Sequence, residues 1–321
     1  IGMVKNSLNP ITYVVAFLVL LIPCSEIVIS ILHWSINKLL DPKFIPKMEL
    51  SKELPQDCTS MVVIPTLLSN KDRVLELIGD LEVYYLANQH KNLYFGLLGD
   101  FKDGKNKEEK EDKHILEVAL NEVKRLNDKY SNNGEDIFYF FNRYRQYNDK
   151  ENIWIGWERK RGKLMEFNAL LRGAKNTSYD TISGDITKLQ KVKYVITLDA
   201  DTQLPRETAK KLIGAMCHVL NKPHVDEKDK RVKRGYGLMQ PRVSVGTIAA
   251  NKTVFSKIFS GETGIDKYTT AISDVYNDFF GEGIFTGKGI YDVDIFNYML
   301  KDEIPENTVL SHDLLEGSYV R

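Results

Sequence analysis

The sequence predicts an α/β fold in which a mostly parallel sheet is covered by helices. Short apolar runs, typical of buried strands, alternate with segments whose apolar residues recur at helical spacing. This alternation favours a parallel sheet with helices on both faces. Polar residues also cluster where the predicted strands end, although packing alone does not require them there: Thr66, Asp100, Asp199, Asp201 and Gln240.

Three apolar runs predict the first strands of this sheet. They cover residues 59–67, 93–98 and 137–142. After the first run, Ser69 and Asp72 form a capping-box-like start for a helix. The apolar residues of that helix fall on one face, and they are Val74, Leu77, Ile78, Leu81 and Tyr85. A charged insert then leads into a second helix that ends near Tyr130.

The second half of the chain continues the alternation. Residues 163–171 should form a helix, and the next strand lies in the segment KYVITLDADTQLP, residues 193–205. Pro205 suits the first position of a helix that ends near Leu220. Residues 221–235 are highly charged and are predicted to form a surface loop.

Asp199 and Asp201 follow the apolar part of that segment directly. Residues two apart on a strand point to the same face, so both carboxylates are expected to converge on one ligand. In open α/β sheets, ligands bind at the carboxyl ends of the strands. Two carboxylates suit Mg²⁺ or Mn²⁺ bound together with substrate phosphates. The alternative is a solvated turn, because Asp-x-Asp alone is a weak motif.

Residues 11–36 are apolar and numerous enough to cross a bilayer. They lack the small-residue cleavage site of a signal peptide. More lysines follow the stretch than precede it, namely Lys38, Lys43, Lys47 and Lys52 against Lys5. The positive-inside rule therefore predicts that the bulk of the chain is cytoplasmic. A buried hairpin or an interfacial helix is the alternative, and the predicted boundary after the membrane segment and linker is residue 50.

Composition excludes some classes of function. The net charge is +0, with 44 basic and 44 acidic residues, which argues against a nucleic-acid partner. Cys24, Cys58 and Cys217 form neither a C-x-x-C pair nor a metal-ligand spacing. We therefore expect reduced thiols in a cytosol-facing protein.

Three further segments carry side chains suited to chemistry. Residues 154–168 (WIGWERKRGKLMEFN) combine two tryptophans with a basic cluster, which could instead be a solvated helix start. Residues 279–293 (FFGEGIFTGKGIYDV) form a glycine-punctuated loop that contains Glu282. His312 and Asp313 follow a short apolar segment.

These motifs, in this order, resemble the glycosyltransferase segment of bacterial cyclic β-1,2-glucan synthases. The resemblance is carried by VVIPTLL, WIGWERKRGKL, TLDADTQLP, MQPRV, FGEGIFTGKGIYDVD and ENTVLSHDLLEG. The apolar IPCSEIVISILHWSINKLL also resembles the membrane segment that precedes that domain. More broadly, the chain resembles inverting GT-A nucleotide-sugar transferases of the cellulose-synthase-like kind. The resemblance implies that residues 51–321 are a GT-A domain within a larger synthase that has further membrane and phosphorylase-like regions.

The resemblance implies UDP-glucose as donor, a β-1,2-glucan as acceptor, and a site in the bacterial inner membrane that faces the cytoplasm. It assigns Asp313 as general base, and Asp199 with Asp201 as ligands of Mg²⁺ or Mn²⁺. The implied donor-binding residues are Thr66, Asp100, Arg159, Lys163 and Asp199. The implied acceptor-binding residues are Trp154, Trp157, Gln240, Glu282 and His312. A core or rim position for Trp154 and Trp157 explains these residues as well as contact with a sugar does.

Other functions compete with this interpretation. A membrane glycosyltransferase that makes another polysaccharide would keep the same aspartates in the same roles. The segment LDADT also resembles haloacid-dehalogenase-type phosphatases, but that motif normally ends the first strand of its domain, and position 203 here is Gln. A truncated module that binds nucleotide or glucan without turnover is the third alternative. This alternative is motivated by the lack of a Q-x-x-R-W-type segment after Asp313 in this sequence.

Overall fold

The computed structural model describes residues 9–41, 43–50, 53–131, 134–228, 230–243, 246, 250–259, 275–280, 285–309 and 312–320. The chain forms two compact units. One contains residues 1–44 and 243–282, and the other contains residues 45–242 and 283–321. All residues of the candidate site discussed below belong to the second unit, except Glu282.

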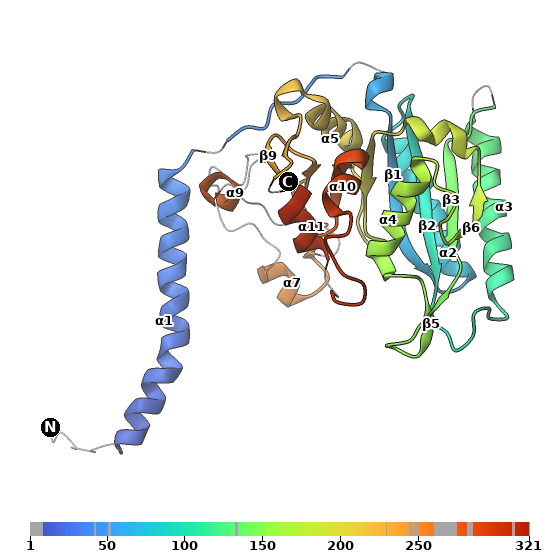
Figure 1. Ribbon diagram of the computed structural model, residues 1–321. Coiled ribbons are helices and arrows are strands. Elements are labelled where there is room, and N and C mark those ends of the chain that lie inside the picture. Colours follow the sequence, from blue (N-terminus) through green and yellow to red (C-terminus); the bar gives the residue numbers. More distant parts are fainter. Residues whose placement is uncertain are drawn as a thin grey trace. The chain divides into compact units, whose positions relative to one another are not determined.

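The second unit is built on a seven-stranded sheet (Figure 1). Four neighbouring strands run parallel: β7 (Tyr194–Thr197), β1 (Ser60–Leu68), β2 (Leu93–Phe101) and β3 (Phe138–Arg143). Antiparallel strands extend both sides: β6 (Tyr179–Ser183) next to β3, and β11 (Gly289–Asp292) with β10 (Leu238–Met239) next to β7. The predicted α/β class with a mostly parallel sheet is therefore confirmed.

Helices cover both faces of this sheet (Figure 1). One face packs against α2 (Lys71–Ala87), α3 (Asp112–Tyr130) and α5 (Thr208–Cys217). The other packs against α4 (Arg159–Leu171), α10 (Val293–Leu300) and α11 (Asp313–Val320). Strand β1 shows the cause: Val62 lies in the first core, and its neighbours Met61 and Val63 lie in the second.

Shorter elements complete this unit. Two hairpins pair β4 (Gln146–Asn148) with β5 (Ile153–Ile155), and β8 (His224–Asp226) with β9 (Arg231–Arg234). The described residues also contain short 3₁₀ helices, namely η1 (Gln56–Cys58), η2 (Ile186–Lys191) and η3 (Val219–Asn221).

The strand order reverses direction at β1. The chain passes from β1 to β2 and β3 on one side, whereas β7 lies on the other side of β1. Pairing between β1 and β7 stops at Val63 and Thr197, but pairing between β1 and β2 continues to Leu68. Pro65, beyond that point, has no N–H to offer a neighbouring strand. The carboxyl ends of β1 and β7 thus form the switch point at which open α/β sheets bind ligands.

Three local predictions were wrong. Helix α2 is capped by Asn70, whose side chain accepts a hydrogen bond from Arg73 N at 2.9 Å, and not by Ser69. Pro205 precedes α5 and its carbonyl accepts from Thr208 N, so the helix starts three residues later than expected and ends at Cys217. The predicted loop 221–235 contains the β8–β9 hairpin, because Val225 and Val232 pack against the core between its charged residues.

The expectation of reduced thiols was also wrong for two of the three cysteines. Cys58, at the end of η1, and Cys217, at the end of α5, form a disulfide. The two residues are 159 positions apart, so motif spacing could not reveal the pair. Cys24 is a free, exposed thiol.

The first unit contains α1 (Pro10–Leu39), α7 (Val254–Phe259) and α9 (Val275–Phe280). Residues Pro10–Ile36 of α1 have a mean hydropathy of 2.6, and by length and composition this helix is apolar and long enough to cross a membrane. Asn9 caps it by accepting a hydrogen bond from Ile11 N at 3.1 Å. Lys43, just after the helix, donates from its backbone to Asp278 Oδ2 of α9 at 2.8 Å.

Candidate active site

Asp199 and Asp201 follow β7 and do not belong to it. The strand ends at Thr197, and Thr202 N donates to Asp199 O at 2.9 Å in the turn that follows. The strand alternation that was expected to align both carboxylates therefore does not reach them. The Asp199 side chain is 32% exposed, and its Oδ1 and Oδ2 lie 2.7 Å from Lys160 Nζ and 3.2 Å from Lys288 Nζ. Asp201 is exposed.

The Asp313 carboxylate lies near Lys160, the partner of Asp199, and Gly287 lies between these two side chains. Lys160 Nζ donates to Gly287 O at 3.2 Å. Gly287 has a φ of +75°, and a Cβ there would lie 2.5 Å from both Lys160 Nζ and Asp313 Oδ1. A side chain on residue 287 would thus clash with both groups. The structure brings together Asp199, Lys160 and Asp313, which come from the β7 turn, α4 and α11.

Gln240 holds the loop that carries Gly287. Its side-chain oxygen accepts hydrogen bonds from Thr286 N at 2.7 Å and from Thr286 Oγ1 at 3.1 Å. Gln240 is exposed, as its predicted acceptor contact requires. In this structure it also fixes the position of the residue next to Gly287.

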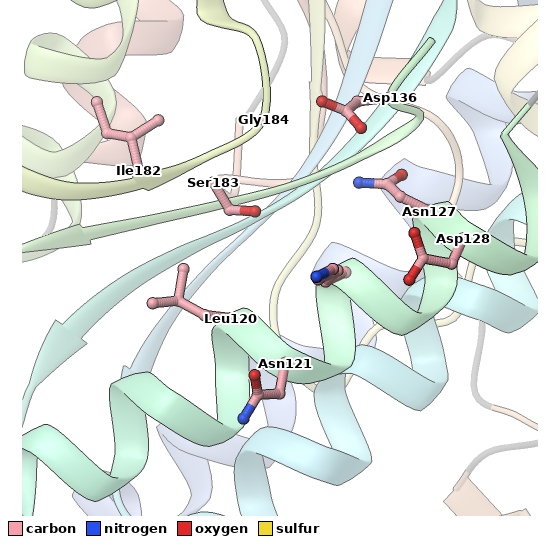
Figure 2. Close-up of a pocket in the computed structure, with 9 residues that line it drawn as sticks. Leu120, Asn121, Asn127, Asp128, Asp136, Ile182, Ser183 and Gly184 are labelled. Carbon is pink, nitrogen blue, oxygen red and sulfur yellow. The ribbon is translucent and has the colours of Figure 1, made fainter. Parts of the chain in front are cut away.

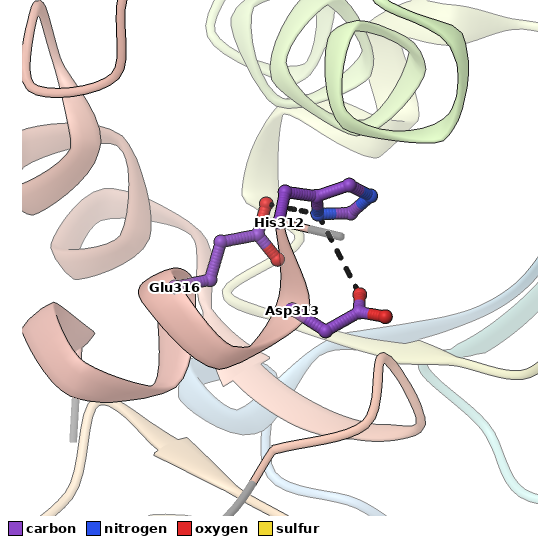
Figure 3. Close-up of side chains that lie close together, drawn as sticks. All are labelled: His312, Asp313 and Glu316. Atoms are coloured by element: carbon purple, nitrogen blue, oxygen red, sulfur yellow. Dashed lines mark ion pairs between the residues drawn. The ribbon is translucent and has the colours of Figure 1, made fainter. Parts of the chain in front are cut away.

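Three side chains cluster at the start of α11 (Figure 3). His312 Nδ1 lies 2.9 Å from Glu316 Oε1 and 3.5 Å from Asp313 Oδ1. Glu316 and His312 are buried, and the Asp313 side chain is 24% exposed. The ligand atoms lie within 4.8 Å of one another, which would suit a metal ion by distance. The sequence had suggested His312 and Asp313 but not Glu316.

Asp100, at the end of β2, is held inside the protein by two cations. Its carboxylate is 2% exposed, and it accepts from Arg143 Nε at 2.7 Å and from Arg143 Nη2 at 2.8 Å. Lys163 Nζ lies 3.1 Å from Asp100 Oδ2 and donates to Thr66 O at 2.5 Å. Arg143 also reaches Glu166 Oε2 at 2.8 Å. The charges of this cluster therefore satisfy one another.

The pKa values of the cluster follow from this burial and pairing. Burial alone would raise the pKa of the Asp100 carboxyl, but the charge of Lys163 and the hydrogen bonds from Arg143 lower it below its usual value. Burial lowers the pKa of Lys163 to about 8, partly opposed by the charge of Asp100. Contact of Lys163 and Thr66 with a donor stays a prediction. In this structure Lys163 Nζ bonds to Asp100 and to the backbone carbonyl of Thr66.

The first turn of α4 distributes its cations to different parts of the site. Lys160 reaches Asp199, and Lys163 reaches Asp100. Arg161 is buried and donates to Ile304 O at 2.9 Å, in the segment that leads to Asp313. Arg159 is 46% exposed and pairs with two acids, Asp103 at 2.9 Å and Glu151 at 2.8 Å. The basic cluster is therefore not a solvated helix start.

The two tryptophans are partly buried. Trp154 pairs through its backbone with Gly104, and its ring centroid lies 5.5 Å from that of Tyr147. The Trp157 carbonyl accepts from Arg143 Nη1 at 2.9 Å. Their contact with an acceptor remains a prediction. Glu282 lies outside the described residues.

Sequence reasoning did not identify five residues of this region: Arg143, Lys160, Gly287, Lys288 and Glu316. Lys160 stood in the basic cluster, and Gly287 with Lys288 stood in the glycine-punctuated loop. Arg143 directly follows a predicted strand, as Asp100 does. A basic residue at a strand end is thus a usable signal, as the acidic and uncharged polar residues at the other strand ends are.

A separate pocket of about 490 Å³ lies between α3 and β6 (Figure 2). Asp136 precedes β3, and Gly184 follows the antiparallel β6, so the pocket is at the amino end of the parallel strands. It contains none of the predicted site residues. Its lining is Leu120, Asn121, Lys124, Asn127, Asp128, Asp136, Ile182, Ser183 and Gly184.

The residues near β7 suit a divalent cation in their donor chemistry. Asp199 and Asp201 both offer hard carboxylate oxygens with solvent access, and Mg²⁺ or Mn²⁺ prefers such ligands. Lys160 and Lys288 hold both oxygens of Asp199 in this structure. Both lysine side chains are partly exposed, at 25% and 24%, so their ion pairs with Asp199 are in contact with solvent.

Comparison with known proteins supports the resemblance seen in the motifs. A scan against protein-family models gave no match. The chain is 42% identical over 308 residues to the cyclic beta-(1,2)-glucan synthase NdvB of Rhizobium meliloti (strain 1021). The alignment covers 96% of this chain and 11% of that protein. The similarity to a cyclic β-1,2-glucan synthase is thus confirmed over nearly the whole chain, which spans a small part of its relative.

Proposed function

We propose that this chain transfers glucose from UDP-glucose to a growing β-1,2-glucan, with inversion at the anomeric carbon, on a GT-A fold. The observation that carries the proposal is the convergence of Asp199, Lys160 and Asp313 around Gly287, at the switch point of the sheet. The similarity to a protein named as a cyclic glucan synthase supports the substrate class.

Asp313 is the general base in this proposal. An acceptor hydroxyl oxygen attacks C1 of the donor glucose from the face opposite the phosphate, and its proton passes to the Asp313 carboxylate. The new C1–O bond forms as the C1–O bond to the diphosphate breaks, and UDP departs with the electron pair. The partial exposure of Asp313 is consistent with access to an acceptor.

Asp199 and Asp201 would hold Mg²⁺ or Mn²⁺, which when bound neutralises charge on the departing diphosphate. Lys160 and Lys288 add two positive charges at the same position. These lysines would favour binding of the donor diphosphate. They would also stabilise the negative charge that UDP acquires as its bond to glucose breaks. We also assign Thr66, Asp100, Arg159 and Lys163 to the donor side.

We place the acceptor on the side of the α11 start and of the Gly287 loop. Gln240 and His312 border this region. Trp154 and Trp157 would offer aromatic faces to glucose units, and Glu282 would contact an acceptor hydroxyl. These assignments concern single sugar units and imply nothing about chain length or cyclisation.

We further propose that α1 anchors the chain in the bacterial inner membrane with the second unit in the cytoplasm. The length and hydropathy of Pro10–Ile36 support a span. Lys38, Lys43 and Lys47 follow it closely, as the positive-inside rule expects of a cytoplasmic flank.

Release of UDP from UDP-glucose by the detergent-purified chain tests the proposal. Wild type should turn over with Mn²⁺ or Mg²⁺, and Asp313→Asn should lower turnover by roughly 10²- to 10⁴-fold, the usual contribution of a general base. Asp313→Asn should keep UDP binding. Asp201→Asn should lose both turnover and metal-dependent UDP binding.

Two results would contradict this function. Wild type that binds UDP without turnover would indicate a donor-binding module, which the 11% coverage of the relative makes a real alternative. Turnover of UDP-N-acetylglucosamine in preference to UDP-glucose would indicate synthesis of another polysaccharide.

A further inference from the structure

The buried carboxylate of Glu316 requires a hydrogen-bond donor or a positive charge nearby. Its side chain is 1% exposed, and neither carboxylate oxygen accepts a hydrogen bond from any residue that the structure describes. A buried carboxylate without a donor or a counter-charge is strongly destabilising. A close polar neighbour of Glu316 is His312, whose Nδ1 lies 2.9 Å from Glu316 Oε1.

This contact decides which nitrogen of His312 carries a proton. Nδ1 faces two carboxylates, Glu316 at 2.9 Å and Asp313 at 3.5 Å. A bare Nδ1 would turn its lone pair toward both of them, whereas a protonated Nδ1 would present positive charge to both at ion-pair distance, although it forms no hydrogen bond with a described residue here. The other ring nitrogen points away from both carboxylates (Figure 3).

The position of His312 in turn distinguishes the two oxygens of Asp313. Oδ1 is buried, 3.5 Å from His312 Nδ1 and next to Gly287. The second oxygen points away from His312 (Figure 3). The side chain is 24% exposed, so a substrate can reach that second oxygen, Oδ2.

We propose that Glu316 is a positioning residue that favours a proton on His312 Nδ1, and that the charge of this proton, 3.5 Å from Asp313 Oδ1, favours the orientation of Asp313 in which Oδ2 is directed to the acceptor. A buried carboxylate sets the tautomer of a histidine in the same way in Ser-His-Asp triads. The role of Asp313 in this statement rests on the proposed function. The Glu316–His312 contact does not.

The first test is the tautomer of His312, read by ¹⁵N NMR of histidine-labelled protein and assigned with His312→Gln. Wild type should show a protonated Nδ1. Glu316→Leu fills a similar volume without an acceptor and should lose that preference, whereas Glu316→Gln keeps an acceptor oxygen and should retain it. Glu76→Gln, at a glutamate that is 60% exposed, is the matched control and should change nothing.

Kinetics of UDP release supply the second test. Glu316→Leu should lower kcat by roughly 10-fold or more, within the ~10²- to 10⁴-fold contribution of the base. The KM for UDP-glucose should stay within about twofold, because a positioning residue of the base does not bind the donor. Glu316→Gln should recover most of kcat. In the Asp313→Asn background, Glu316→Leu should cause no further loss.

Several outcomes would overturn the proposal. One is a bare Nδ1 on His312 in wild type. Another is a His312 signal that titrates stoichiometrically with added Mn²⁺ or Zn²⁺, since the three groups would then form a cation site. A third is unchanged kcat in folded Glu316→Leu. If wild type shows no turnover, the proposed function fails, but the tautomer measurement still decides the Glu316–His312 contact.

Discussion

Asp100 lies at the end of the parallel strand β2 and Asp199 follows the parallel strand β7, yet their surroundings differ. Asp100 is 2% exposed, and Arg143 and Lys163, which bond to it, are themselves almost fully buried. Asp199 is 32% exposed, and the lysines that pair with it are about one-quarter exposed. Both carboxylates have two cationic partners, so the number of partners does not distinguish them.

The two carboxylates differ in how easily a ligand can replace their cationic partners. Breaking the Asp100 cluster would leave buried charges without partners, so it serves as a fixed part of the sheet edge. The ion pairs of Asp199 compete with water, and water screening makes them weak. A ligand can replace such partners at low cost. We therefore expect substitutions at the first region to affect stability, and those at the second to affect turnover.

The largest effect should follow from removing Arg143. Arg143→Met leaves Asp100 and Glu166 without their shared cation and should lower the free energy of unfolding by about 3–5 kcal/mol. Urea denaturation of the detergent-purified chain, followed by circular dichroism, measures this. Arg159→Met is the control, since Arg159 also pairs with two acids but is 46% exposed, and it should cost about 0–1 kcal/mol. Equal losses of unfolding free energy in Arg143→Met and Arg159→Met would show that burial of the ion pairs does not decide their contribution to stability.

Gly287→Ala should have the next largest effect, on turnover. The new Cβ would lie 2.5 Å from Lys160 Nζ and Asp313 Oδ1, so both must move, and UDP release should fall roughly 100-fold or more. Gly134→Ala has nearly the same backbone φ, +73°, and no atom within 4 Å of the new Cβ. It carries the same backbone strain, about 1–2 kcal/mol, and should leave turnover unchanged. Loss of activity in both variants would attribute the effect to strain alone.

Lys163 should make stability depend on pH. Its pKa of about 8 in the folded chain lies below that of an exposed lysine, so between pH 8 and about 9.5 the unfolded chain binds more protons. The free energy of unfolding should therefore rise with pH, by at most about 1.4 kcal/mol per unit. Lys163→Met should lack this rise.

The comparison of wild type with Lys163→Met matters above pH 9.5. Burial raises the pKa of tyrosines such as Tyr139 and Tyr291, and their ionisation in the unfolded chain lowers stability from about pH 10. Both proteins share these tyrosines, so they cancel in the difference. A wild-type curve parallel to that of Lys163→Met would show that Lys163 keeps an ordinary pKa.

Asp199→Asn should have the smallest effect on stability. Its ion pairs are partly solvated, so the free energy of unfolding should change by less than about 1 kcal/mol. Differential scanning calorimetry tests this at the same pH. Turnover in the same variant should fall strongly if Asp199 serves the donor. A large loss of stability would place Asp199 with the fixed cluster of Asp100.

The sequence predicted the strands more accurately than the groups that meet between them. Apolar runs placed β1, β2, β3 and β7 within a few residues, because burial on both faces requires uninterrupted apolar stretches. The side-chain direction of Asp199 could not be predicted, since β7 ends two residues before it. The disulfide and the pairs of Lys160 and Glu316 depend on distances through space. A pattern along the chain carries no information on those distances.

The first turn of α4 has a consequence for the order in which the molecule assembles. Residues 158–163 bond to partners at positions 66, 100, 103, 199, 287, 304 and 307. These partners span most of the second unit, so each contact closes a long stretch of chain. The turn can acquire its final contacts only after both halves of the sheet have met. We therefore expect the contacts of these side chains to form late in folding, and a fluorescent probe near this turn would follow their formation.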